Sequence, residues 1–306
     1  MRTGSPLAGL VAVALTVTAV AAVRAQSAVP PDRHVVRVDG HPLTVWARQP
    51  PVPRGAVLLI HGRTWSSLPD FDLDVPRLQR SVLTSLVSRG LAAYAVDLRG
   101  YGATPRDATG WLTPGRAAED VQEVLAWIAE RHQGLPPPAV VGWSRGAAIG
   151  MLAVQRAPAR ASSLVMFGFA FEPGTRFAEA TPSISPARQR NTADAARSDF
   201  VSPRVTPPAV IRAFVDQALR ADPVMVDLRG DGEFSELDPT RLSRPVLILY
   251  GERDPTVTAA HATRLAAAFT NAPARLVVLP GADHAAHLEN THDLWVRTVD
   301  DFVSGR

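Results

Sequence analysis

Short apolar runs alternate with amphipathic stretches along most of the chain, and this alternation limits the fold more than any other feature. The run at residues 55–60, GAVLLI, has no polar side chain, which is typical of a strand buried on both faces of a sheet. Such runs predict strands at residues 34–38, 43–47, 55–60, 91–96, 139–141, 163–167, 245–249 and 276–279, and helical periodicity predicts helices at residues 74–89, 116–132, 147–156, 259–269 and 291–303. Strands that alternate with crossover helices predict an α/β fold, with a mostly parallel central sheet and helices on both faces.

One segment interrupts the alternation. Residues 171–243 contain no clear strand, are rich in Pro, Ser, Thr and Arg, and hold one amphipathic stretch at residues 207–221. A connection of about 70 residues is too long for a plain loop. We therefore expect residues 34–170 and 244–306 to form the core. Residues 171–243 are expected to form a mainly helical cap, inserted after the sixth strand and lying over the C-terminal edge of the sheet.

The N-terminal residues differ in kind from the rest. Arg2 precedes an uncharged run at residues 7–23, and Val-Arg-Ala at residues 23–25 offers small side chains to a signal peptidase. The run falls short of the about 20 strongly apolar residues of a membrane anchor. We expect residues 1–25 to be a cleaved signal peptide, residues 26–33 to be a linker, and the mature protein to be periplasmic or secreted. The alternative is an uncleaved N-terminal membrane anchor.

The composition excludes several functions. The chain has no Cys, so it has no thiol nucleophile, no disulfide and no Cys-based metal site. Its 32 basic residues are all Arg and accompany 29 acidic residues, and they form no stripe that could follow a phosphate backbone. We expect no nucleic acid as a partner, and contact with a membrane only if the N-terminal segment stays attached.

The sequence Gly142-Trp-Ser144-Arg-Gly146 follows an apolar strand and opens a helix. A Ser on such a sharp turn has a strained backbone, and only small residues fit two positions before and after it. The turn lifts the hydroxyl clear of the sheet, and the N-terminus of the helix stabilises negative charge nearby. The motif predicts that Ser144 is a nucleophile.

A Ser hydroxyl is a weak nucleophile and needs a base within hydrogen-bond reach. Asp254 follows the apolar run at residues 245–249, and His284 follows the run at residues 276–279. The carboxyl ends of parallel strands meet at one edge of the sheet, so both side chains are expected at the edge that carries Ser144. We expect His284 to be the general base and Asp254 to be the acid that orients it.

Other residues compete for these roles. His287 is a second candidate for the base, and Glu172 and Glu252 are further candidates for the acid. Asp283 adjoins His284 and is expected to be a loop residue. A metal site built on the two His residues has no third ligand in view, so no metal is expected.

The oxygen that becomes negative during acyl transfer needs fixed donors. The N–H of Arg145, directly after the Ser, is one candidate. The N–H of Arg63, in the loop after the third strand, is the other, with Thr64 as the alternative. One of the two Arg side chains could bind a carboxylate of the substrate; the alternative is that both point to solvent or pair with the acids at residues 70–74.

With these motifs in place, the chain from about residue 32 onward resembles the α/β-hydrolase superfamily, in its capped branch. The motifs that carry the resemblance are His61-Gly62, Asp97-Leu-Arg-Gly100-Tyr-Gly102, the Ser144 pentapeptide, Gly251-Glu-Arg-Asp254 and Gly281-Ala-Asp-His284-Ala-Ala-His-Leu-Glu289. The resemblance implies the order Ser, acid, His, with a Glu five residues after the His, which favours His284 over His287. It also implies a tetrahedral intermediate, an acyl-enzyme, water as the second nucleophile and no cofactor. Ser144 stands where haloalkane dehalogenases and epoxide hydrolases of similar scaffold use Asp.

Together these features predict an exported serine hydrolase that cleaves a small or medium carboxylic ester, a small-molecule substrate. A C–C bond hydrolase, acyltransferase or peptidase using the same three side chains is the alternative, and a non-catalytic binding protein on this scaffold is a further one. Five aromatic residues are candidate pocket walls: Trp65, Trp143, Phe169, Phe171 and Phe214.

Overall fold

The computed structural model describes residue 1, residues 29–179 and residues 185–306. The predicted signal peptide at residues 1–25, apart from residue 1, and the first part of the predicted linker lie outside the described residues. Strand β1 begins at Asp32 and pairs with β2 from that residue on. The last two residues that the sequence assigns to the linker therefore belong to the sheet.

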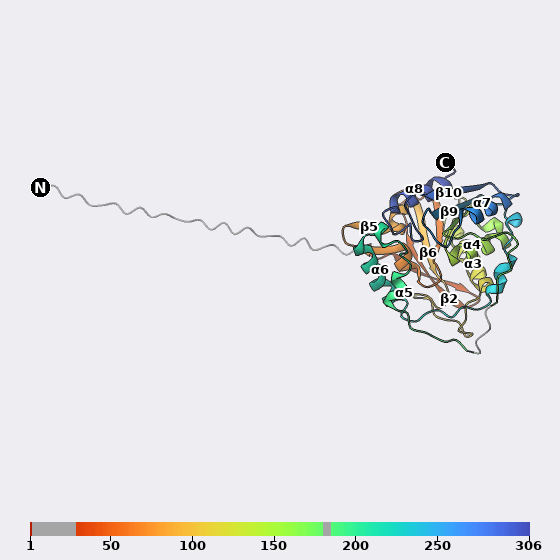
Figure 1. The fold of residues 1–306 in the computed structure, drawn as a ribbon, viewed down its shortest axis with the longest axis horizontal. Coiled ribbons are helices and arrows are strands. Elements are labelled where there is room, and N and C mark those ends of the chain that lie inside the picture. The colour runs from red at the N-terminus through yellow and green to blue at the C-terminus, as the bar shows by residue number, and fades with distance from the viewer. Residues whose placement is uncertain (2–28, 180–184) are drawn as a thin grey trace.

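An eight-stranded sheet forms the centre of the molecule, in the order β1-β2-β6-β3-β7-β8-β9-β10 (Figure 1). The strands of this sheet are β1 (Asp32–Val38), β2 (His41–Arg48), β3 (Gly55–Ile60), β6 (Leu91–Asp97), β7 (Ala139–Trp143), β8 (Leu164–Phe167), β9 (Val246–Gly251) and β10 (Ala274–Leu279). The β1–β2 and β2–β6 pairs are antiparallel, and every other pair is parallel. The predicted mostly parallel sheet is confirmed.

Helices cover both faces of the sheet, as the alternation predicts (Figure 1). They are α1 (Ser67–Phe71), α2 (Val82–Val87), α3 (Pro114–Arg131), α4 (Arg145–Arg156), α5 (Ala193–Arg197), α6 (Pro208–Ala221), α7 (Ala259–Ala268) and α8 (His292–Val303), with 3₁₀ turns η1 (Pro158–Arg160), η2 (Pro203–Val205), η3 (Asp231–Glu236) and η4 (Pro239–Arg241). Helices α3, α4 and α7 pack into one apolar core, and α1, α2, α6 and α8 pack into the other.

Strand β3 shows why the apolar runs become central strands. Leu58 and Ile60 enter one apolar core, and Val57 and Leu59 enter the other. Successive side chains of a strand point to opposite faces, so a strand between two helical layers needs apolar residues at every position. Each such side chain stabilises the fold by about 1.5–3 kcal/mol when it leaves water.

The predicted helix at residues 74–89 is wrong in its first half. The structure has a hairpin of β4 (Asp72–Val75) and β5 (Leu78–Ser81), and only then the short helix α2. Pro76 and Arg77 form the two-residue turn, and Arg77 has a φ of +68°. A residue before Pro avoids the helical region, and Pro followed by a positive φ is typical of a tight turn. Local turn chemistry therefore overrides the apparent helical period.

The segment between β8 and β9 holds α5, η2, α6, η3 and η4 and no named strand among its described residues. We call residues 171–243 the insertion. Its helix α6 packs against α1 and β4, and Phe214 of α6 meets the ring of Trp65 in the loop after β3. It also reaches the loop after β10, because the amide of Ser202 donates to the carboxylate of Asp283.

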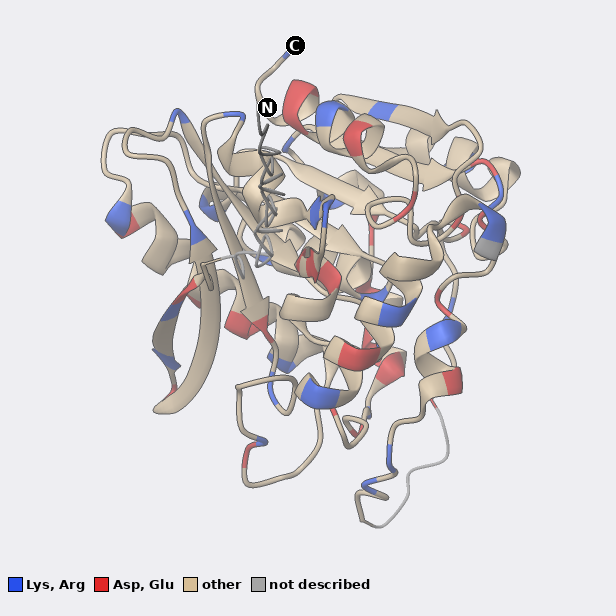
Figure 2. Cartoon of the chain, turned by 90° about the vertical axis from the view of Figure 1, so that its left-hand side faces the viewer, with Lys and Arg blue, Asp and Glu red and all other residues tan. Residues whose placement is uncertain are grey.

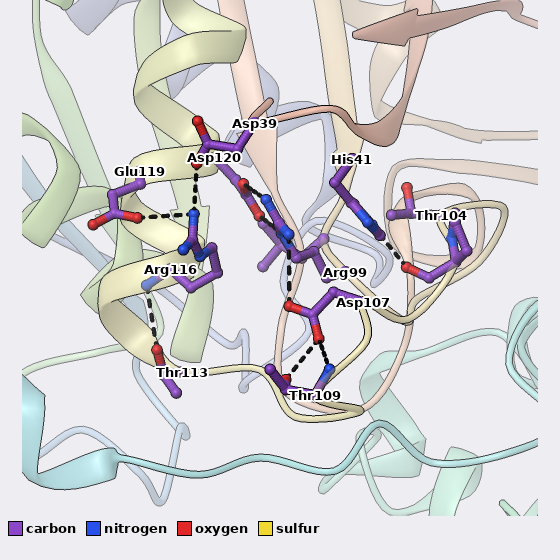
Figure 3. Close-up of polar contacts among 12 residues, drawn as sticks. Asp39, His41, Arg99, Thr104, Asp107, Thr109, Thr113, Arg116, Glu119 and Asp120 are labelled. Atoms are coloured by element: carbon purple, nitrogen blue, oxygen red, sulfur yellow. Dashed lines mark hydrogen bonds and ion pairs between the residues drawn. The ribbon is translucent and has the colours of Figure 1, made fainter. Parts of the chain in front are cut away.

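A buried ion pair fixes the loop after β6 against α3 (Figure 3). Nε and Nη2 of Arg99 both bond the carboxylate of Asp120 at 2.7 Å. A third partner, Asp107, lies 3.5 Å from Nη1 of Arg99. Burial raises the pKa of Asp120 against the opposing effect of Arg99. Breaking such a pair leaves an uncompensated buried charge, so the pair holds the segment in one place.

Charged residues are mixed along the chain. In the view of Figure 2 basic and acidic segments are interspersed over the helices and loops. Among the described residues, no helix is both long enough and apolar enough to cross a bilayer.

Candidate active site

Ser144 stands on a strained turn between β7 and α4. Its backbone has φ +53° and ψ −120°, values that a residue with a side chain rarely adopts. The turn has no room for larger neighbours, because a Cβ on Gly142 would lie 2.3 Å from the oxygen of Gly146, and a Cβ on Gly146 would lie 2.3 Å from the oxygen of Ile60. The amide of Ser144 donates to the oxygen of Phe167 over 2.8 Å, which ties the turn to β8.

His284 and Asp254 come together after β10 and β9. The Nδ1–H of His284 donates to Oδ2 of Asp254 over 2.9 Å. The other oxygen, Oδ1, accepts from the amide of Thr256 at 2.9 Å and from its hydroxyl at 2.6 Å. The carboxylate is buried and is held by donors on both oxygens, so it fixes the orientation of the imidazole ring.

Ser144 and His284 line the same small cavity. Its volume is about 50 Å³, and its other walls are Gly62, Arg63, Thr64, Trp65, Trp143 and Asp199. Two of the five aromatic residues predicted as pocket walls, Trp65 and Trp143, therefore line this cavity. Phe171 and Phe214 lie instead in the apolar cores, and Phe169 packs against one of them. The structure brings the three predicted catalytic side chains to one edge of the sheet.

The loop after β3 is held by carboxylates. The amide of Gly62 donates to Asp70 at 3.2 Å, the amide of Ser66 to Asp222 at 2.8 Å, and the amide of Ser67 to Asp97 at 3.0 Å. These bonds leave the backbone beside the cavity in a fixed position.

The amide of Arg63 has no acceptor within the described part of the chain, while its carbonyl oxygen accepts from the hydroxyl of Tyr101. Arg145 is the first residue of α4, where a helix N–H has no partner inside the helix. Two backbone donors are therefore free beside Ser144.

His61, at the end of β3, supports the same loop as a neutral ring. Its Nδ1 lies 2.9 Å from the oxygen of Gly62, and its Nε2 accepts from the amide of Leu98 over 3.2 Å. Burial lowers the pKa of His61 to about 4. The ring is therefore uncharged near neutral pH, and its hydrogen bonds link the loop after β3 to Leu98, directly after β6.

The competing candidates lie elsewhere. Glu172 bonds Arg264 at 2.6 Å and is half-exposed, and Glu252 accepts from the amide of Gly281. Asp283 accepts from the amide of Ser202. His287 is fully buried among aromatic rings, with that of Trp143 at 4.6 Å, and burial holds its pKa well below its ordinary value. None of the four lies against the Nδ1 of His284.

The side chains of Arg63 and Arg145 differ in their contacts. The guanidinium of Arg145 bonds Asp231 at 2.7 Å and lies over the ring of Phe234, so the predicted pairing with residues 70–74 is wrong for it. The side chain of Arg63 is exposed and has no ion-pair partner within the described ranges. Arg63 and Thr64 also border a second cavity of about 260 Å³, which adjoins the first across this loop.

Sequence reasoning missed one residue of the cavity, Asp199. It lies between α5 and η2 of the insertion, in a stretch without periodicity, so no pattern marks it. Burial raises the pKa of Asp199 to about 6, opposed by the charge of His284 and by the indole N–H of Trp65. Within the described residues no group of three His, Asp or Glu side chains could hold a metal ion.

Comparisons with known proteins concern the family and the fold. A family model described as the alpha/beta hydrolase family matches residues 57–298, and no curated protein matches the chain.

Among solved structures, epoxide hydrolase A from Mycobacterium thermoresistibile is 19% identical with a TM-score of 0.67, over 90% of this chain and 98% of that one. A hydrolase from Pseudomonas aeruginosa PA01 is 21% identical with a TM-score of 0.63, over 89% and 98%. E-2-(acetamidomethylene)succinate hydrolase is 20% identical with a TM-score of 0.60, over 90% and 99%. At these identities the likeness is one of fold.

Proposed function

Because the chain belongs to the alpha/beta hydrolase family, we propose that it is a serine hydrolase that cleaves a small or medium carboxylic ester. One observation carries the proposal. Ser144 lines a cavity together with His284, whose Nδ1 is held by the buried carboxylate of Asp254. That hydrogen bond leaves Nε2 of His284 as the ring nitrogen that can act as the base.

In the proposed reaction the Oγ of Ser144 attacks the ester carbonyl while Nε2 of His284 takes its proton. The tetrahedral oxyanion accepts hydrogen bonds from the amides of Arg63 and Arg145, which are free to donate. The C–O bond then breaks, and the imidazolium returns its proton to the departing alcohol. Water attacks the acyl-enzyme by the same route, releasing the carboxylic acid and restoring the Ser hydroxyl. Asp254 stabilises the imidazolium in both halves.

The sizes of the two cavities support a small or medium ester. The cavity of about 50 Å³ at Ser144 holds only a few atoms, while the neighbouring cavity of about 260 Å³ shares Arg63 and Thr64 with it. One part of the ester would lie in each. The insertion forms part of both walls, through Asp199 in the first and Met225 in the second, and we propose that it acts as a cap that shapes the site.

The same three side chains could also serve a C–C bond hydrolase, an acyltransferase or a peptidase. The Ser at position 144 supports acyl chemistry over epoxide opening, since similar scaffolds that open epoxides carry Asp there.

We further propose that residues 1–25 direct export. Sequencing the N-terminus of the protein recovered outside the cytoplasm tests this, and an intact Met1 there contradicts cleavage.

The test of the proposed reaction is hydrolysis of p-nitrophenyl esters of increasing acyl length by the parent protein and its Ser144→Ala variant. Ser163→Ala is the matched control, because Ser163 is also buried but lies directly before β8, at the opposite end of the parallel strands from Ser144. Turnover that disappears in Ser144→Ala and persists in Ser163→Ala supports the proposal. Absence of turnover on every ester by the folded parent overturns the esterase proposal and directs the search to amides, C–C bonds and acyl transfer.

A further inference from the structure

Asp199, a carboxylate outside the proposed catalytic set, lines the cavity of Ser144. Asp199 is the one acid among the eight residues that line it. Its Oδ2 is shielded from solvent and makes no hydrogen bond within the described residues. The indole N–H of Trp65 favours its ionised form but lies outside hydrogen-bond geometry. A buried carboxylate oxygen without a donor is costly, so its presence beside a nucleophile calls for an occupant of the cavity that supplies the donor.

The charges around Asp199 indicate which kind of donor is missing. No Arg lies within ion-pair distance of Asp199 in the described chain. His284 is the one group whose positive charge favours the ionised form. Its Nδ1 is already committed to Asp254, and its other nitrogen is needed for the reaction.

A second acid, Asp70, lies behind the cavity wall, where it accepts from the amide of Gly62. Asp70 is fully buried, its Oδ1 has no partner in the described part of the chain, and the charge of Asp199 helps to raise its pKa well above the ordinary value. A raised pKa favours the protonated, uncharged form of Asp70, so Asp199 supplies the negative charge at the cavity wall, where the side chain of Arg63 is exposed and makes no ion pair with it in the described chain. A cation bound there interacts across a short distance with little water between, where electrostatic attraction is strong.

We propose that Asp199 is a specificity-determining residue that selects esters carrying an ammonium group within a few bonds of the scissile carbonyl. This inference rests on the proposed esterase function and deepens it. The ammonium group donates to the unpartnered Oδ2 of Asp199, while the carbonyl carbon lies against Ser144. The distance is set by the cavity, because a volume of about 50 Å³ leaves room for only a few atoms between the two groups.

Matched esters test the selection. The p-nitrophenyl esters of glycine and of propionic acid have the same size, and only the first carries an ammonium group. A second pair, 2-(dimethylamino)ethyl acetate and 3-methylbutyl acetate, places the charge on the alcohol side. For each pair the measured quantity is the ratio of kcat/KM for the cationic ester to that for the neutral one, after correction for spontaneous hydrolysis.

We expect the ratio for at least one pair to exceed unity in the parent and to fall about tenfold in Asp199→Asn, which keeps the shape and removes the charge. Asp216→Asn is the matched control, since Asp216 is an exposed acid on α6 of the same insertion, and it should keep the parent ratio. Asp199→Ala provides a second variant if the Asn variant does not fold. Ratios unchanged by removal of Asp199 overturn the inference, while Ser144-dependent turnover of the neutral esters would leave the esterase proposal standing.

If the parent hydrolyses none of these esters, the esterase proposal fails and binding decides the inference. Calorimetry on the Ser144→Ala variant then compares glycine methyl ester with methyl propionate. Tighter binding of the cationic ester that is lost when Asp199→Asn is added supports the cation site. Equal binding of the two esters, or a preference that survives the added substitution, overturns it.

Discussion

The indole N–H of Trp143 donates to the carbonyl oxygen of His284 over 2.9 Å. Trp143 immediately precedes Ser144, so this bond joins the turn that carries the proposed nucleophile to the loop that carries the proposed base. The two rings also meet, with centroids 5.4 Å apart. The separation between Ser144 and His284 therefore depends on a side chain that takes no part in the chemistry.

Trp143→Phe should weaken this connection while keeping an aromatic ring at the position. We expect kcat/KM on p-nitrophenyl esters to fall about tenfold, because small displacements of reacting groups slow the reaction. The free energy of unfolding should fall by about 1 kcal/mol from the lost hydrogen bond. Trp295→Phe is the control, since the indole N–H of the buried Trp295 has no partner among the described residues. Equal kinetic losses in the two variants would show that ring size matters and the bond does not.

Asp254→Asn should abolish most of the activity without unfolding the protein. The amide cannot hold His284 in the tautomer that leaves Nε2 free, and in other Ser-His-Asp enzymes this change costs about 10⁴ in kcat. Glu172→Gln tests the competing acid and should keep parental kcat, because Glu172 pairs with Arg264 on the surface. Steady-state kinetics of both variants measure the difference. A large loss in the Glu172 variant with activity retained in the Asp254 variant would reverse the assignment.

Gly146→Ala should destabilise the fold as well as the site. The added Cβ would meet the backbone oxygens of Ile60 and His61 at 2.3 and 2.4 Å, and backbone atoms in the central sheet have little freedom to move. We expect a loss of about 3 kcal/mol or more in the free energy of unfolding, measured by urea titration. Gly55→Ala, whose Cβ meets only the side chain of Leu91 at 3.4 Å, should cost less than about 1 kcal/mol. Similar midpoints for the two variants would contradict the close approach.

Asp199 should make the fold less stable as the pH rises. Its pKa is about 6 in the fold against an ordinary value of 3.8, so the folded state binds more protons than the unfolded state between these values. The resulting stability is complete below the lower value and is lost as the pH rises through about 6. The loss is at most about 3 kcal/mol.

Asp199→Asn removes this titration. Urea unfolding at about pH 4 and about pH 8 should therefore show the variant gaining stability relative to the parent at the higher pH. A difference between the two proteins that is the same at both pH values would mean that the carboxyl of Asp199 titrates normally in the fold.

The central sheet follows from the sequence because strands buried on both faces leave a strong signal. In β3 every position must be apolar, and residues 55–60 satisfy this requirement without any knowledge of their neighbours. The predicted helix at residues 74–89 failed for the opposite reason. There the turn at Pro76 and Arg77 decides the structure, and two residues contribute little to a periodicity counted over a long window.

The proposed catalytic residues were predictable because each lies at a fixed place relative to a strand. Ser144 follows β7 directly, and Asp254 and His284 lie shortly after β9 and β10. The position of Asp199 depends instead on how the insertion packs against Trp65 and the loop after β10. That packing is made of contacts between residues far apart in the chain, and no local pattern reports it.

The small cavity at Ser144 also limits how fast water can complete the reaction. An acyl group that fills a space of about 50 Å³ leaves no room for the water that must attack next to it. Esters of longer acids would then release their alcohol quickly and their acid slowly. The protein would accumulate as a covalent intermediate, visible as a burst of alcohol equal to the enzyme concentration.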